Sequence, residues 1–136
     1  MYEKGFKLEI ITPARVVFQD EALSVNAPGT KGGFQVLYNH APFMSTIEIG
    51  EIKVKDKNGH DLLFATSGGF VEVKENRVTV LADTAELAGE IDTQRAKASG
   101  ERAAERMQSG DPGIDVERAR LAKRKSLNRL RVALKA

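Results

Sequence analysis

Hydrophobic and polar residues alternate in short segments over the first 81 positions of the chain. Residues 6–10 (Phe-Lys-Leu-Glu-Ile) place an apolar side chain at every second position, and Gly, Pro and Asn interrupt the segments that follow. This period of two is typical of antiparallel strands with one buried face. Segments 14–19 and 22–27 are predicted to be two strands separated by a turn at Asp20.

Two short turns predict hairpins. Asn58-Gly59 predicts a two-residue turn, because both residue types tolerate positive φ angles. Glu75-Asn76 marks the centre of a second hairpin. Its predicted pairs are Val71 with Val80 and Val73 with Val78 on the core face, and Glu72 with Thr79 on the solvent face. Nine or ten such strands in about 83 residues indicate a β-sandwich or a flattened barrel.

The pattern changes after residue 85, where aromatic residues are absent and Ala, Arg and Lys recur at helical spacing. Asp92 is predicted to cap a helix that runs to about Gln108. Asp83 with Glu86 forms an alternative capping box that would start this helix earlier.

A second helix is predicted after the break at residues 109–113 (Ser-Gly-Asp-Pro-Gly), with Asp115 as its N-cap and its end near residue 136. Two helices joined by so short a turn fold into an antiparallel hairpin. We call this hairpin the arm. Small residues dominate its inner faces, so the helices approach closely but bury little apolar area, and the arm should dock on another surface and be able to undock. The inner positions are Ala96, Ser99, Gly100, Ala103 and Met107, and Val116, Ala119, Ala122, Ser126, Leu127, Leu130, Ala133 and Leu134.

The second helix is strongly basic on its other sides. From residue 114 onward, eight Lys and Arg stand against two Asp and Glu, which favours an acidic partner. Leu121 and Val132 are predicted to be exposed apolar residues among these charges, either as a second contact surface or as part of a solvated face. The basic stripes are Arg120, Arg124, Arg131 and Lys135, and Arg118, Lys125 and Arg129.

The composition excludes several classes of protein. A chain of 136 residues with 41% hydrophobic and 29% charged residues is globular and soluble, with one domain or a small domain plus an appendage. No apolar run approaches the ~18 residues of a membrane span. The first residues do not resemble a signal peptide. The absence of cysteine excludes disulfides and zinc–thiolate sites.

No active-site motif is present. The Gly-rich run 28–33 lacks the order of a phosphate-binding P-loop, and residues 66–69 are not a nucleophile elbow, so both are predicted to be turns. His60 is predicted to be a solvated hairpin residue. His40 precedes Ala-Pro in a loop of defined extended geometry, which favours a structural or partner-contact role over catalysis.

Residues 27–43 (Ala-Pro-Gly-Thr-Lys-Gly-Gly-Phe-Gln-Val-Leu-Tyr-Asn-His-Ala-Pro-Phe) closely resemble the P-G-x-x-G-x-x-G-V-L-P-N-H-A-P-L pattern of epsilon subunits of F-type ATP synthases. Residues 67–86 resemble the last strands of that family, and residues 118–132, ending Asn-Arg-Leu-Arg-Val, resemble its C-terminal helix. Gln35 and Tyr38 stand where the family usually has glycine and proline. The resemblance covers essentially the whole chain in the right order.

The resemblance implies an α+β fold, with an N-terminal ten-stranded antiparallel β-sandwich over residues 1–85 and a C-terminal antiparallel two-helix hairpin over residues 86–136. It implies a non-catalytic rotor subunit of the central stalk, peripheral on the cytoplasmic face of the bacterial plasma membrane and not inserted in it. The sandwich would bind the gamma subunit and the membrane rotor ring. The arm would reach the catalytic alpha and beta subunits and inhibit ATP hydrolysis. The residues expected at these partner contacts are Lys31, His40, Arg120, Leu121, Arg124, Arg131 and Val132.

Residues 91–96 (Ile-Asp-Thr-Gln-Arg-Ala) resemble the I/L-D-x-x-R-A motif of epsilon subunits that bind ATP. The resemblance implies that no cofactor is required but that ATP is a regulatory ligand of the folded arm. Folding is expected to bring basic stripes of both helices beside one seam, where an anion separates the like charges. Alternatively, neighbouring glutamates neutralise the arginines and nothing binds. The implied ATP contacts are Ile91, Asp92, Arg95, Arg102, Lys125 and Arg129, with Lys125 where ATP-binding relatives prefer arginine.

Two functions are alternatives to a rotor subunit: nucleic-acid binding and generic protein binding. A nucleic-acid-binding protein would use the basic helix, but that helix lacks aromatic residues for base stacking, and the first 84 residues are acidic. A generic β-sandwich protein-binding module with a basic helical tail fits the pattern without the family. Co-purification with a gamma subunit separates this module from the rotor subunit.

Overall fold

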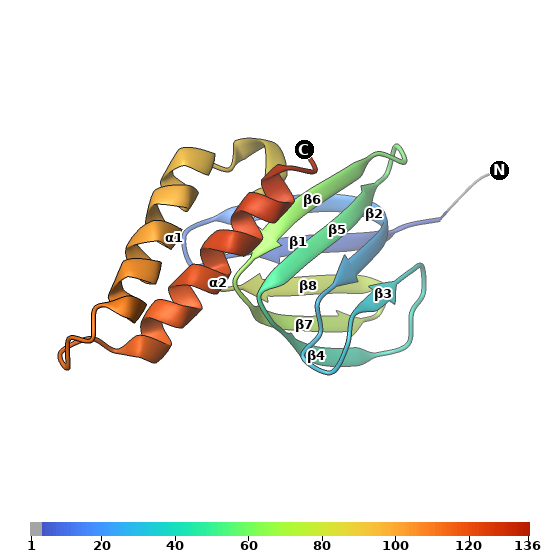
Figure 1. The fold of residues 1–136 in the computed structure, drawn as a ribbon. Helices are drawn as coiled ribbons and strands as arrows, with labels where there is room; N and C mark the ends of the chain where they lie inside the picture. The colour runs from blue at the N-terminus through green and yellow to red at the C-terminus, as the bar shows by residue number, and fades with distance from the viewer. Residues whose placement is uncertain (1–3) are drawn as a thin grey trace.

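The computed structural model describes residues 4–136, which form a β-structure followed by two helices (Figure 1). Nine strands lie within these residues: β1 (Phe6–Ile11), β2 (Val16–Ala27), β3 (Phe34–Val36), β4 (Phe43–Ile47), β5 (Gly50–Asp56), β6 (Asp61–Thr66), β7 (Gly69–Lys74), β8 (Arg77–Ala82) and β9 (Ala85–Leu87). A 3-10 turn, η1 (Ala88–Glu90), leads to α1 (Thr93–Gln108) and α2 (Val116–Ala133). The predicted α+β fold class, a β-sandwich followed by a helical hairpin, is confirmed, with nine strands in residues 4–136 where ten were expected.

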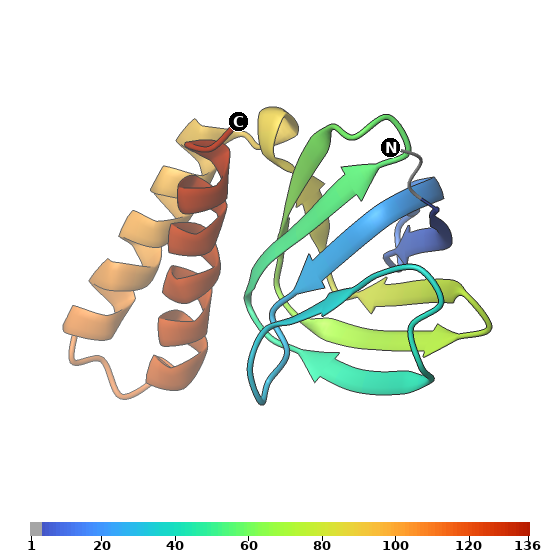
Figure 2. The same ribbon diagram turned by 90° about the vertical axis from the view of Figure 1, so that its right-hand side faces the viewer.

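The strands form one sheet that folds into two layers, seen edge-on in Figure 2. Their order is β4-β7-β8-β1-β2-β5-β6-β9, with β3 paired to β2. Strands β1 and β8 run parallel, so the wholly antiparallel pairing predicted from the sequence is wrong at this pair. Parallel neighbours need a long connection, which the strands between β1 and β8 provide.

Strand β2 belongs to both layers. Its first half pairs with β1 and its second half with β5, with a register shift between Ala22 and Ser24. The turn predicted at Asp20 is therefore wrong, because the chain changes partner within one bent strand. The Glu21 amide, 2.8 Å from Asp20 Oδ1, and the Lys57 ammonium, 3.3 Å from Oδ2, hold the pKa of the Asp20 carboxyl below its usual value.

The hairpin of β7 and β8 has the predicted register. Glu75 and Asn76 have φ angles of 51° and 57°, the combination of a type I′ turn. This turn matches the twist of the flanking strands, and the three predicted residue pairs are confirmed.

The hairpin of β5 and β6 differs from its prediction. The Asp56 amide donates to His60 O at 2.8 Å, and the Gly59 amide donates to Asp56 O at 3.0 Å. Gly59 has a φ of 83°, whereas Asn58 is not in the left-handed region. The loop therefore has three residues and ends in a left-handed glycine, so the predicted two-residue turn is wrong.

The core lies between the layers and consists of the inward side chains of every strand. Strand β6 is buried on both faces near its end, with Phe64 in this core and Ala65 directed toward the helices. Ala65 belongs to a second, smaller apolar cluster with Ala88, Ile91 and Val132. The arm docks on the sandwich at this cluster.

Asn76 fixes the loop that carries His40. Its Oδ1 accepts from the Asn39 amide at 2.7 Å, and its Nδ2 donates to Gly5 O at 3.1 Å. The His40 ring lies edge-on to Phe43, with 5.9 Å between ring centroids. One turn residue thus ties this loop to Gly5, the residue before β1.

The helices begin where the sequence predicted. Asp92 caps α1 by accepting from the Arg95 amide at 3.0 Å, and Asp115 caps α2 by accepting from the Arg118 amide at 3.1 Å. The alternative start at Asp83 is excluded, because residues 85–87 form β9.

The two helices lie side by side, with α2 nearer the sandwich and α1 on its outer side (Figure 2). Ala96 and Ala103 of α1 are buried against α2, and the Ser126 hydroxyl donates to Ala96 O. The predicted inner face of α1 is confirmed. On α2, Val116, Leu127 and Leu134 are exposed, so their predicted inner placement is wrong.

The error on α2 has a geometric cause. A helix packed between two partners buries two stripes, and α2 buries Ala119 and Ser126 toward α1 but Asn128 and Val132 toward the sandwich. The helical wheel gives the faces of a helix but not the number of its partners.

Candidate functional site

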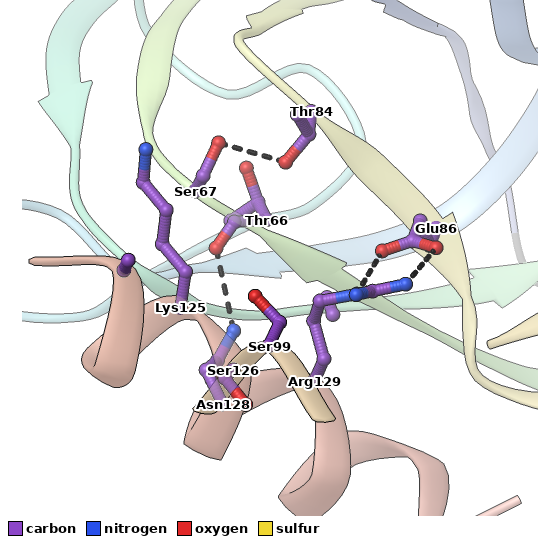
Figure 3. A pocket seen from close by; sticks show the side chains of 11 residues that line it. Thr66, Ser67, Thr84, Glu86, Ser99, Lys125, Ser126, Asn128 and Arg129 are labelled. Atoms are coloured by element: carbon purple, nitrogen blue, oxygen red, sulfur yellow. Dashed lines mark hydrogen bonds and ion pairs between the residues drawn. The ribbon is translucent and has the colours of Figure 1, made fainter. Parts of the chain in front are cut away.

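A cavity of about 280 Å³ lies between α2 and the adjoining end of the sandwich (Figure 3). Strand β6, the segment leading to β9, and both helices line it. Its lining residues are Ala65, Thr66, Ser67, Thr84, Glu86, Ser99, Ala122, Lys125, Ser126, Asn128 and Arg129. The cavity exists only while the arm is docked, because the arm and the sandwich supply opposite walls.

A two-point ion pair spans the cavity. Arg129 of α2 donates to Glu86 of β9 from Nε at 2.6 Å and from a terminal nitrogen at 3.0 Å. Both side chains are partly buried. Such charge-assisted, two-point contacts are among the stronger polar interactions in proteins.

The rest of the cavity holds one further cation and several hydroxyl groups. Lys125 lines it without an acidic partner among residues 4–136. The Thr84 and Ser67 hydroxyls are 2.7 Å apart, and Ser99 of α1 adds a third. This combination of one lysine and several hydroxyl groups suits an anionic ligand.

A second surface lies on the outer face of the sandwich, across β1, β2, β7 and β8. Residues paired across neighbouring strands point to the same face. Ile11 pairs with Val16 on one side and with Leu81 on the other, and Leu81 pairs with Phe70. We call these four residues the apolar row; Val16 and Leu81 are each 50% exposed. Such a contiguous exposed apolar strip on a sheet is typical of a contact surface.

No group of three or more His, Cys, Asp or Glu side chains within residues 4–136 is placed to hold a metal ion. Neither of the two helices in the described part of the chain is long and apolar enough to cross a membrane.

Comparison with known proteins identifies the family. The model of the ATP synthase delta/epsilon chain β-sandwich domain matches residues 5–88, and that of the long α-helix domain matches residues 90–133. The ATP synthase epsilon chain of Desulforamulus reducens is 45% identical over 130 residues, which cover 96% of this chain and 98% of the relative. The chain belongs to the ATP synthase epsilon family. The epsilon chain of Syntrophomonas wolfei is 40% identical and covers 99% and 98% of the two chains.

Solved structures show the same fold. A chain of the Euglena gracilis mitochondrial ATP synthase (OSCP/F1/c-ring) superposes with a TM-score of 0.81 at 20% identity, covering 98% of this chain and 84% of that one. A chain of the Tetrahymena thermophila mitochondrial ATP synthase central stalk and c-ring gives 0.56 at 14% identity, covering 99% and 98%. Membership of the epsilon family makes this chain a non-catalytic subunit of an ATP synthase.

The ATP contacts that the epsilon resemblance implied lie in different places in the structure, and only some of them line the cavity. Lys125 and Arg129 line the cavity. Ile91 lies in the second apolar cluster, and Asp92 caps α1. Arg95 and Arg102 are exposed and do not line the cavity, so the basic stripes of the two helices do not share one seam.

The expected partner residues lie on several surfaces. Lys31 is exposed in the Gly-rich loop, and His40 is half-buried in the next loop. Arg124 and Arg131 are exposed on α2, as is Arg120, which pairs with Glu117.

The two apolar residues that the sequence predicted to be exposed on α2 differ. Leu121 is 41% exposed, which confirms its placement. Val132 is 1% exposed and packs against Ala65, Ala88 and Ile91, so its predicted exposure is wrong. The physical reason is that the sandwich covers this side of α2.

Sequence reasoning missed most of the cavity wall. Thr66, Ser67 and Thr84 were assigned only to turns and strands, and Asn128 only to a family pattern. These residues come from separate elements, and no local period or motif brings them together.

Proposed function

We propose that this chain is a rotor subunit of the central stalk, whose sandwich (residues 1–85) binds the gamma subunit and the membrane rotor ring and whose arm (residues 86–136) is regulatory. The apolar row is the observation that supports the gamma contact, because four apolar side chains on one outer face need a partner to cover them. Lys31 and His40 lie on loops of the same sandwich and are assigned to the rotor interface. The subunit is peripheral, on the cytoplasmic face of the plasma membrane.

Leu81→Glu tests the gamma contact. The change removes a burial worth about 1.5–3 kcal/mol and places a charge in the interface, so the affinity for gamma should fall at least ~100-fold. The measurement is co-purification with tagged gamma, followed by titration. Asn58→Glu adds the same charge at an exposed turn on the other layer and should leave binding unchanged. Unaltered binding of Leu81→Glu would show that the apolar row does not face gamma.

We further propose that the released arm inhibits ATP hydrolysis through its basic face. Arg120, Arg124 and Arg131 are exposed in the docked arm, where Arg120 pairs with Glu117, and they can meet acidic surfaces of the alpha and beta subunits. Leu121 is exposed beside them, and Val132 becomes exposed on release. Each exposed ion pair contributes only ~0.2–1 kcal/mol, so the three arginines act together.

Changing Arg120, Arg124 and Arg131 to glutamate should raise ATP hydrolysis by the assembled complex several-fold. Changing the same residues to glutamine should give an intermediate rate, since it removes attraction without adding repulsion. The measurement is steady-state hydrolysis at matched subunit content. Equal rates for all three complexes would mean that this face is merely solvated.

The cavity supports ATP as the regulatory ligand. Lys125 has no acidic partner in the described part of the chain, Arg129 would exchange the Glu86 carboxylate for a phosphate, and the surrounding hydroxyls can donate to phosphate oxygens. A volume of about 280 Å³ suits the triphosphate end of a nucleotide better than the whole molecule. A ligand that binds only the docked arm stabilises the docked state by RT ln(1 + [L]/Kd). At a high ATP concentration the arm would then stay docked and would not inhibit hydrolysis.

Isothermal titration of the isolated chain with millimolar ATP tests this ligand. Heat of binding is expected from the parent chain and not from the Lys125→Ala, Arg129→Ala double variant, which removes both cations that line the cavity. Lys125→Arg should bind more tightly, because a guanidinium offers a planar fork to phosphate. Arg118→Ala, at an exposed position at the start of α2, is the control and should bind as the parent does. Equal heat from the parent and the double variant would exclude this site.

A further inference from the structure

The face of α2 that meets the sandwich is mostly polar. Lys125, Asn128, Arg129, Val132 and Lys135 recur at helical spacing on this face, and the apolar contact comes from Val132 with Ala133 beside it. Lys135 pairs with Glu51 of β5 at 3.0 Å, and Arg129 pairs with Glu86. A docking face of this composition is readily hydrated after release, which lowers the cost of undocking.

Asn128 makes the most buried polar contact of this face. It is 5% exposed, and its Nδ2 donates to Gly50 O at 2.9 Å and to Thr66 O at 3.3 Å. Gly50 and Thr66 face each other in the ladder of β5 and β6, so one carboxamide bonds both strands at the same level. Figure 3 shows the Asn128 amide directed at Thr66.

The two ion pairs cannot fix the position of the helix in the same way. Lysine and arginine side chains have long flexible stems, so Lys135 and Arg129 could keep their partners after a small shift of α2. The asparagine side chain is short, and both of its bonds are lost if the helix slides or rotates by part of a turn. The neighbouring contact of Val132 is apolar and non-directional.

We propose that Asn128 determines the docking register of the arm: its carboxamide bonds to Gly50 O and Thr66 O select one docked arrangement, and water takes over these bonds when the arm is released. A buried polar group that selects one arrangement is known from coiled-coil interfaces, where it fixes register at some cost in stability. This role belongs to the chain without any ligand, and it depends neither on ATP binding nor on assembly.

Asn128→Asp is the sharpest test, because it keeps the side-chain shape but replaces the donor with a carboxylate that repels both oxygens. The ratio of docked to released arm should fall at least about tenfold. Asn128→Ala, which only removes the donor, should give a smaller fall in the same direction. Leu127→Asp adds the same charge at the adjacent exposed position and should dock as the parent does.

The chain has no cysteine, so nitroxide labels can be attached cleanly to Asn58→Cys on the β5–β6 turn and Gln108→Cys at the end of α1. Pulsed electron resonance on the full chain without nucleotide should give one narrow distance distribution for the parent and for Leu127→Asp. Asn128→Asp should add a second, broad distribution. Circular dichroism checks that each variant is folded, and if Asn128→Asp is not, Asn128→Ala decides. The proposal is overturned if the folded Asn128 variants keep the parent distribution, or if Leu127→Asp broadens it equally.

Discussion

Val132→Asp should release the arm while leaving the sandwich folded. The side chain is 1% exposed among Ala65, Ala88 and Ile91, and the cations next to it on the same face, Arg129 and Lys135, are already paired with Glu86 and Glu51. Burying an unpaired charge costs several kcal/mol, more than a small docking surface provides, so the docked fraction should fall at least ~100-fold. Limited trypsin digestion measures this, because the arm carries many Lys and Arg residues that docking protects.

Leu121→Asp is the matched control, since it adds the same charge on the exposed side of the same helix. Its arm should be cleaved at the parent rate, whereas the arm of Val132→Asp should be cleaved much faster and leave a resistant fragment of about residues 1–95. Equal cleavage of the two variants would show that the second apolar cluster does not hold the arm.

Gly69→Ala should destabilise the sandwich more than any other single methyl group added to a glycine. Gly69 has a φ of 147°, and a Cβ there would lie 2.8 Å from Ala82 Cα and even closer to Leu81 O. The clash is with backbone of the neighbouring strand, which cannot move without opening the β7–β8 ladder. The free energy of unfolding should fall by about 3 kcal/mol, a large part of the ~5–15 kcal/mol typical of a domain.

Gly89→Ala provides the comparison for this prediction. A Cβ at Gly89 meets no atom within 4 Å, and its φ angle is not positive. Its free energy of unfolding should stay within about 0.5 kcal/mol of the parent value or rise slightly, because alanine reduces the entropy of the unfolded chain. Urea denaturation of the two variants decides; similar midpoints would contradict the clash.

Most of the confirmed sequence predictions rest on local interactions, although the local turn at Asn58-Gly59 was predicted wrongly. The β7–β8 register was predicted because alternation and turn are encoded within about ten residues, and the caps at Asp92 and Asp115 because a cap is local. The change of partner within β2 and the parallel pairing of β1 with β8 were missed, because both depend on residues far along the chain.

The candidate site shows the same limit. Lys125 and Arg129 were found through a family pattern and the spacing of charges, and both line the cavity. Thr66 and Ser67 were not found, because only the folded sandwich places them opposite α2. The exposure of Val132 was predicted wrongly because a helical wheel cannot tell solvent from a second packing partner.

The oxygens that receive the Asn128 amide belong to the main chain, and this has a consequence for variation within the family. A carbonyl oxygen is present whatever side chain its residue carries, so the sandwich keeps these acceptors while its sequence drifts, provided that the strands keep their path. The arm of one family member that has the asparagine could therefore be grafted onto the sandwich of another and still dock in the same position. On the sandwich side, docking of this kind depends on the path of the backbone and not on a set of matching side chains.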